Sequence, residues 1–75
     1  MIKLSKEGKE AFKVADRFLV EQTTDKAGFL VVACKNKARH YIHDQDAPAF
    51  FTSDSAACKF IQQHAGANPH IYLVS

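Results

Sequence analysis

The stretch that decides the fold runs from Pro48 to Val74 and reads PAFFTSDSAACKFIQQHAGANPHIYLV. Thr52, Ser53 and Asp54 carry side-chain oxygens that can accept hydrogen bonds from the free N–H groups at the start of a helix. Apolar residues then recur at helical spacing, a glycine follows, and an apolar run closes the stretch. This order predicts a helix packed on a β-sheet. The residues expected on the buried helix face are Ala56, Ala57, Phe60, Ile61 and His64, with Gly66 ending the helix before a strand at His70–Val74.

A first helix is expected from Ser5 to about Gln22. Ser5 can cap it, and apolar side chains recur along the segment with the spacing of one helix face. The residues of this face are Leu4, Ala11, Phe12, Ala15, Phe18 and Leu19.

Two strands are expected between the helices. Phe29–Cys34 is apolar throughout, too short for a helix and rich in strand-forming residues. Because both of its faces are apolar, it should lie in the middle of a sheet. After a polar turn, Arg39–Asp44 forms a hairpin with it. Alternation places His40 and Ile42 on one face of this second strand, and Tyr41 and His43 on the other.

These elements predict an α+β fold, a two-layer sandwich with the order α-β-β-α-β. A right-handed crossover would place the third strand beside the first, which gives a three-stranded, mainly antiparallel sheet of order 2-1-3. Both helices are expected on one face of this sheet. A chain of 75 residues supports one small domain, residues 1–75.

The opposite face of the predicted sheet has nothing to cover it. Its apolar side chains could expose several hundred Å², at or above what a soluble monomer usually leaves in water as one patch. The candidates are Leu30, Val32, Cys34, Tyr41, Tyr72 and Val74. A homodimer, or a larger protein docked on this face, would cover it. The interface is expected at Leu30, Val32, Tyr41, Tyr72 and Val74.

Composition favours an ordinary globular protein, with 47% hydrophobic and 24% charged residues. The longest apolar run is far shorter than the roughly 20 residues of a membrane span, and the first residues lack the apolar core of a secretory signal. We therefore expect a cytoplasmic protein with no membrane partner. Cys34 and Cys58 form no CxxC motif and are expected as reduced, buried thiols.

Charge is unevenly distributed along the chain. The net charge is +2 overall, but it is +4 over residues 1–40 and −2 over residues 41–75. Lys35, Lys37 and Arg39 cluster in the hairpin turn, and Tyr41 could stack on a base beside them. This cluster makes nucleic acid the second possible partner. The basic stripe of Lys6, Lys9, Lys13 and Arg17 on the first helix is interleaved with acidic residues, which is typical of a solvated helix face.

The histidines give little support for a metal or a catalytic centre. His40 and His43 lie near Asp44 and Asp46, but their odd spacing on a strand points them to opposite faces, so no metal site is expected. His64 is expected to have a structural role at the end of its helix.

A helix followed by a hairpin whose second strand carries Arg39, His40 and Tyr41 resembles the HicA-type toxins, small ribonucleases on a double-stranded-RNA-binding fold. The resemblance covers about residues 5–45. It implies that His40 would be the general acid or base. The sequence departs from the family pattern, in which a Gly-Ser pair precedes the histidine and the element order is α-β-β-β-α.

No glycine-rich phosphate loop, GxSxG or HExxH motif is present in the sequence. The expected function is therefore a small non-enzymatic interaction module without a cofactor, docking through the open sheet face onto itself or another protein. Nucleic-acid binding by the hairpin turn and a ribonuclease centred on His40 are the alternatives.

Overall fold

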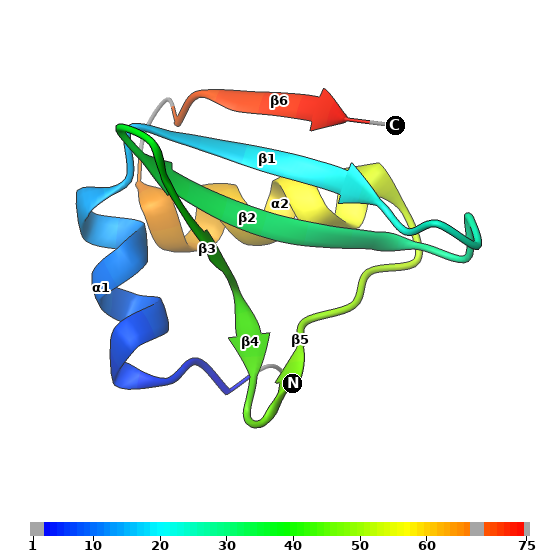
Figure 1. Cartoon of the computed structure of the whole chain (residues 1–75), viewed down its shortest axis with the longest axis horizontal. Coiled ribbons are helices and arrows are strands. Elements are labelled where there is room, and N and C mark those ends of the chain that lie inside the picture. Colours follow the sequence, from blue (N-terminus) through cyan, green and yellow to red (C-terminus); the bar gives the residue numbers. More distant parts are fainter. Residues whose placement is uncertain (1–2, 67–68, 75) are drawn as a thin grey trace.

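The computed structural model describes residues 3–66 and 69–74 and confirms the α+β class (Figure 1). Its elements are α1 (Lys6–Val14), β1 (Arg17–Gln22), β2 (Phe29–Lys35), β3 (Ala38–Tyr41), β4 (His43–Asp44), β5 (Ala47–Pro48), α2 (Asp54–Ala65) and β6 (Ile71–Val74). Within these ranges, no helix is long and apolar enough to cross a lipid bilayer.

The main sheet has four strands in the order β3-β2-β1-β6. Neighbours β1–β2 and β2–β3 run antiparallel, whereas β6 runs parallel to β1. The predicted order 2-1-3 is therefore wrong in one respect. The last strand does not lie beside the strand at residues 29–35, because β1 is inserted between them.

The insertion arises because the first helix is shorter than predicted. It ends at Val14, and Ala15 already has an extended backbone, with φ −65° and ψ 138°. Phe18 and Val20 alternate with more exposed neighbours and pair with Ala33 and Val31 of β2. Ala15, Phe18 and Leu19 have the spacing of a helix face, whereas Phe18 and Val20 have the spacing of a strand face. Pairing along the whole of β1 stabilises the strand.

The predicted helix caps are present. The Ser5 hydroxyl accepts a hydrogen bond from the Gly8 N–H at 3.0 Å, and the Ser53 hydroxyl accepts one from the Ala56 N–H at 3.1 Å. Gly66 follows α2 with a φ of 82°, a conformation that residues with a side chain rarely adopt.

Both helices pack on the same face of the sheet, as predicted. Phe12 of α1 stacks on Phe18 of β1, with ring centroids 5.2 Å apart, and meets Phe60 of α2 edge to face at 5.6 Å. This core faces the helices, and its members are Phe12, Phe18, Val20, Val31, Ala33, Ile42, Ala49, Phe51, Ala57, Phe60 and Ile61. The layer arrangement leaves the other face of the sheet without a helix (Figure 1).

The predicted strand Arg39–Asp44 is divided into two. β3 ends at Tyr41, and Ile42 turns into the core, where its N–H donates to the Val31 carbonyl at 2.9 Å. His43 then begins a separate two-stranded hairpin, β4–β5. Ile42 keeps the core side that alternation assigns to it, and its carbonyl accepts from the Ala49 N–H at 3.0 Å, so the chain leaves β2 directly after this residue.

Candidate functional site

All six residues expected on the open face share it. In the strand register, Leu30, Val32 and Cys34 of β2 alternate with Val31 and Ala33, which lie in the core. On one side of β2, residues of β3 pair with them on the same face. On the other side, residues of β1 pair with them, and residues of β6 pair in turn with those of β1. The face comprises Arg17, Leu19, Glu21, Leu30, Val32, Cys34, Arg39, Tyr41, Tyr72 and Val74.

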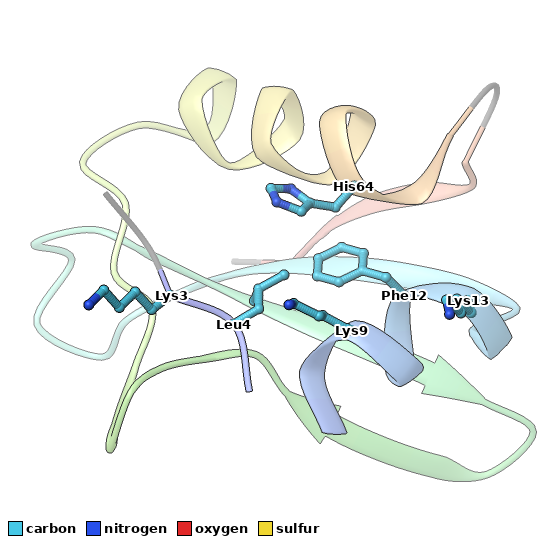
Figure 2. Close-up of a pocket in the computed structure, with 6 residues that line it drawn as sticks. All are labelled: Lys3, Leu4, Lys9, Phe12, Lys13 and His64. Carbon is cyan, nitrogen blue, oxygen red and sulfur yellow. The ribbon is translucent and has the colours of Figure 1, made fainter. Parts of the chain in front are cut away.

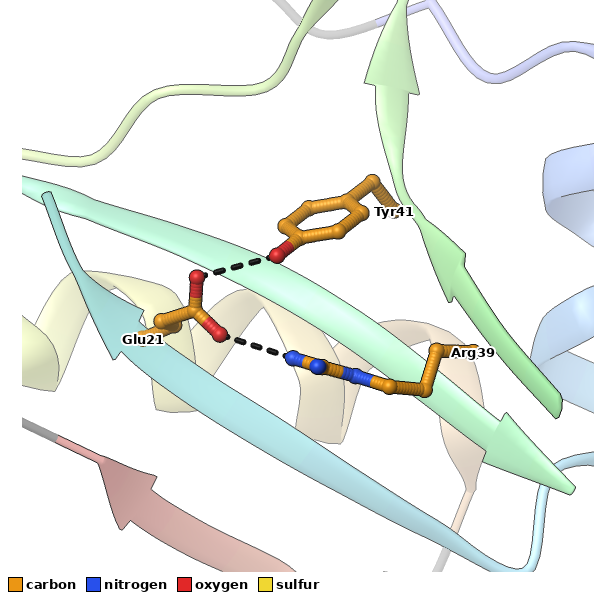
Figure 3. A network of polar contacts seen from close by, with 3 residues as sticks. All are labelled: Glu21, Arg39 and Tyr41. Carbon is orange, nitrogen blue, oxygen red and sulfur yellow. Dashed lines mark hydrogen bonds and ion pairs between the residues drawn. The ribbon is translucent and has the colours of Figure 1, made fainter. Parts of the chain in front are cut away.

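Part of this face is covered by the chain itself. Glu21 of β1 accepts a hydrogen bond from the Tyr41 hydroxyl at 2.9 Å and pairs with the Arg39 guanidinium at 2.8 Å. Figure 3 shows these β3 side chains reaching toward β1 over β2. Val32 is 0% exposed and Cys34 is 1% exposed. The apolar middle of the open face is therefore shielded by polar side chains.

The same contacts alter the acidity of Tyr41. Its hydrogen bond to the Glu21 carboxylate raises the pKa of the phenol, with smaller contributions from desolvation and from the negative charge of Glu21. The neutral phenol is the form that can donate to the carboxylate.

The exposed part of the apolar surface lies on β6. Tyr72 is 53% exposed, Leu73 is 63% exposed and Val74 is 38% exposed. Tyr72 and Val74 lie on the open face, while Leu73 alternates to the helix side. Since β6 is the last strand in the order, its outer edge has no strand partner in the described residues. Apolar side chains and a free backbone edge thus coincide in this one strand.

The structure does not gather the four candidate nucleic-acid residues on one surface. Arg39 and Tyr41 lie on the open face and are bonded to Glu21. Lys35 lines a cavity of about 240 Å³ on the helix side together with Arg39 and His40, whereas Lys37 lies in the turn between β2 and β3.

The prediction that His40 and His43 point apart is wrong. Because the strand stops at Tyr41, their ring centroids come to 6.3 Å, and the Nδ1–H of His43 donates to the Tyr41 carbonyl at 2.8 Å. Among the residues with described positions, no three histidine, cysteine or acidic side chains come together to hold a metal ion. The small cavity beside His40 is lined by no carboxylate.

The two cysteines lie on opposite sides of the sheet. Cys34 is on the open face, whereas Cys58 is in α2 on the helix side. Both are free thiols. Burial raises the pKa of the Cys58 thiol, and the charge of Asp54 raises it further.

A basic cleft lies on the helix side and was missed by the sequence analysis. Its volume is about 650 Å³, and it is lined by Lys3, Leu4, Lys9, Phe12, Lys13 and His64 (Figure 2). The available signal was the spacing of Lys9 and Lys13, which puts both on one face of α1. The sequence could not show that the end of α2 and the N-terminal segment would close the other sides.

Comparison with protein-family models, with curated proteins and with solved structures finds no match.

Proposed function

We propose that this protein is a small, non-enzymatic interaction module that associates with a second copy of itself through β6 and the neighbouring open sheet face. The single observation that supports this proposal is the exposure of three consecutive apolar side chains, Tyr72, Leu73 and Val74, on an edge strand.

The backbone of β6 supports pairing at this edge. An outer strand presents N–H and C=O groups that can hydrogen-bond to another strand, and proteins usually protect such edges with charges, proline or a covering element. The strand Ile71–Val74 contains no charge and no proline. It therefore lacks the usual protection against strand addition.

A second copy of the chain would cover both the exposed apolar side chains and the unpaired edge of β6 in a single interface. Two β6 strands meeting antiparallel about a two-fold axis would pair their free edges with each other, and each apolar side chain would meet the same strand of its partner. Tyr72 and Val74 would then extend the apolar surface of Leu19 and Leu30, which are half-buried on the same face. Val32 is omitted from this contact surface because it is fully covered within one copy.

The oligomeric state tests the proposal. Sedimentation equilibrium should show a dimer whose population rises with protein concentration. Tyr72→Lys and Leu73→Lys should shift the protein to monomer while its circular dichroism spectrum is retained, because an edge lysine opposes strand addition.

Val14→Lys is the matched control. Val14 is also an exposed apolar residue, but it lies at the end of α1 on the helix side. This variant should dimerise like the wild-type protein. A wild-type protein that stays monomeric at millimolar concentration, or equal dimerisation of all variants, would contradict the proposal.

A further inference from the structure

We infer that the basic cleft between α1 and the end of α2 binds a nucleoside phosphate, with the phosphate held by lysines and the base placed against the exposed His64 ring. This site lies on the helix side of the sheet, away from the surface proposed for self-association.

The charge of the cleft selects an anion. Three of its six lining residues are lysines, and none is acidic. Lys9 and Lys13 are one turn apart on α1, where like charges repel each other and a bound anion would relieve the repulsion. No acidic side chain pairs with these lysines among residues 3–66 and 69–74, where the one ion pair joins Arg39 to Glu21.

The position of the walls is fixed by the fold. The Lys3 N–H donates to the Asp44 carboxylate at 3.0 Å, and the Lys3 carbonyl accepts from the Gln45 N–H at 3.2 Å. These bonds hold the N-terminal segment against the β4–β5 turn. Figure 2 shows Lys3 and Lys13 at the two ends of the cleft, with Lys9 between them. The three basic groups therefore come from two separately anchored segments.

His64 is oriented by two ring contacts and one hydrogen bond. Its ring lies 4.4 Å from the Phe60 ring and 5.4 Å from the Phe12 ring, measured between centroids. Its Nδ1–H donates to the Phe60 carbonyl at 2.9 Å, since a carbonyl can only accept. This bond leaves Nε2 as the free nitrogen of the ring, able to hydrogen-bond to a ligand.

The remaining walls are apolar and favour a ligand with a flat hydrophobic part. Leu4 and the buried Phe12 lie between the lysines, and the exposed His64 ring faces them across the cleft and offers the aromatic surface for a base (Figure 2). Bases stack on aromatic side chains regardless of their sequence. The volume of about 650 Å³ lies within the range of small-molecule sites. A bare inorganic anion would use the lysines and leave the exposed His64 ring in water.

Titration of the ¹⁵N-labelled full chain with AMP, adenosine and inorganic phosphate tests the inference. AMP should bind more tightly than either of the other two, and it should shift the amide signals of Leu4, Lys9, Phe12 and Lys13 and the ring signals of His64. Binding should weaken as salt is added, because the lysines are exposed. Equal binding of inorganic phosphate, equal binding of adenosine, or no saturable binding of AMP would overturn the inference.

Substitution of the lysines locates the site. Lys9→Gln and Lys13→Gln should each weaken AMP binding roughly tenfold, the usual effect of losing a charge-assisted hydrogen bond. Lys6→Gln is the matched control, because Lys6 is on the same helix but does not line the cleft. An equal loss of AMP affinity in all three variants would indicate non-specific charge attraction and would overturn the inference.

Two further measurements complete the test. The first distinguishes a free nucleotide from a nucleic-acid strand, and the second distinguishes failure of this inference from failure of the proposed self-association. A single-stranded oligoadenylate that binds more tightly than AMP would indicate a nucleic-acid strand, and one that binds equally or less tightly would indicate a free nucleotide. The Tyr72→Lys variant should bind AMP like the wild-type protein. Loss of dimerisation without loss of AMP binding would show that the two surfaces act independently.

Discussion

Tyr41 of β3 and Glu21 of β1 are hydrogen-bonded over the intervening strand β2, with 2.9 Å between the phenol oxygen and the carboxylate. Arg39 binds the other oxygen of the same carboxylate. The three side chains form a polar cover on a face whose central residues, Val32 and Cys34, are apolar or weakly polar. They explain how one copy of the chain shields the middle of a sheet that has no helix on this side.

The titration of Tyr41 should depend on Glu21. The hydrogen bond to the carboxylate raises the pKa of Tyr41, so replacing Glu21 with alanine should move that pKa down toward its ordinary value, about 10. Absorbance at 295 nm during alkaline titration measures this change, in a Tyr72→Phe background that leaves one tyrosine. An unchanged midpoint in Glu21→Ala would contradict the prediction.

The sign of the linked stability follows from the same shift. Because the folded-state pKa of Tyr41 is above the unfolded value, the hydrogen bond stabilises the fold fully below about pH 10. The contribution is lost as the pH rises through the raised folded-state pKa. Urea unfolding at pH 8 and pH 11 should show a larger loss of stability in the wild-type protein than in Tyr41→Phe.

Cys34 should become reactive when the polar cover is opened. It lies opposite Arg39 in the β2–β3 register and is 1% exposed. In a Cys58→Ser background, Arg39→Ala should accelerate its reaction with a thiol reagent, whereas Lys37→Ala in the turn should not. Equal rates in the two variants would show that Arg39 does not shield the thiol.

Gly28 should tolerate no side chain. A Cβ at this position would lie 2.5 Å from the Phe51 carbonyl oxygen and would overlap the Phe50 ring. Gly28→Ala should therefore destabilise the protein by about 1–3 kcal/mol, the usual cost of overpacking. Gly8→Ala is the control, since its Cβ meets only ordinary contacts at 3.5 Å and should add about 0.5–1 kcal/mol of helix stability. Urea denaturation of both variants measures the difference.

The Ser53 cap of α2 should contribute measurably to stability. Its hydroxyl accepts a hydrogen bond from the Ala56 N–H, so Ser53→Ala should lower the free energy of unfolding by about 1 kcal/mol. Ser55→Ala, at an exposed position inside the same helix, should be neutral or slightly stabilising. A loss of the same size in both variants would assign the effect to the helix as a whole and contradict the cap.

The elements with strong local signals could be predicted from the sequence. Ser5 and Ser53 act within one helical turn of the N–H groups they cap, and Gly66 ends α2 through its own positive φ, so their roles depend little on the rest of the chain. The open face could be predicted for a similar reason. Alternation along β2 assigns its two faces whatever strands lie beside it.

The elements that depend on distant partners could not be predicted. Arg17–Gln22 has apolar spacing that suits a helix, and only its pairing with both β2 and β6 makes it a strand. The same holds for both candidate sites. The cover over Val32 requires β1 and β3 to lie on either side of β2, and the basic cleft requires α1 and α2 to meet.

The parallel pairing of β6 with β1 also has a kinetic consequence. β1, β2 and β3 follow one another along the chain and can assemble through short loops, whereas Phe18 meets Ile71 only after α2 has carried the chain back. We expect β6 to be the last strand to join and the first to detach, with the fastest amide exchange in the sheet. An assembly that depends on this strand would accept only molecules whose folding is finished.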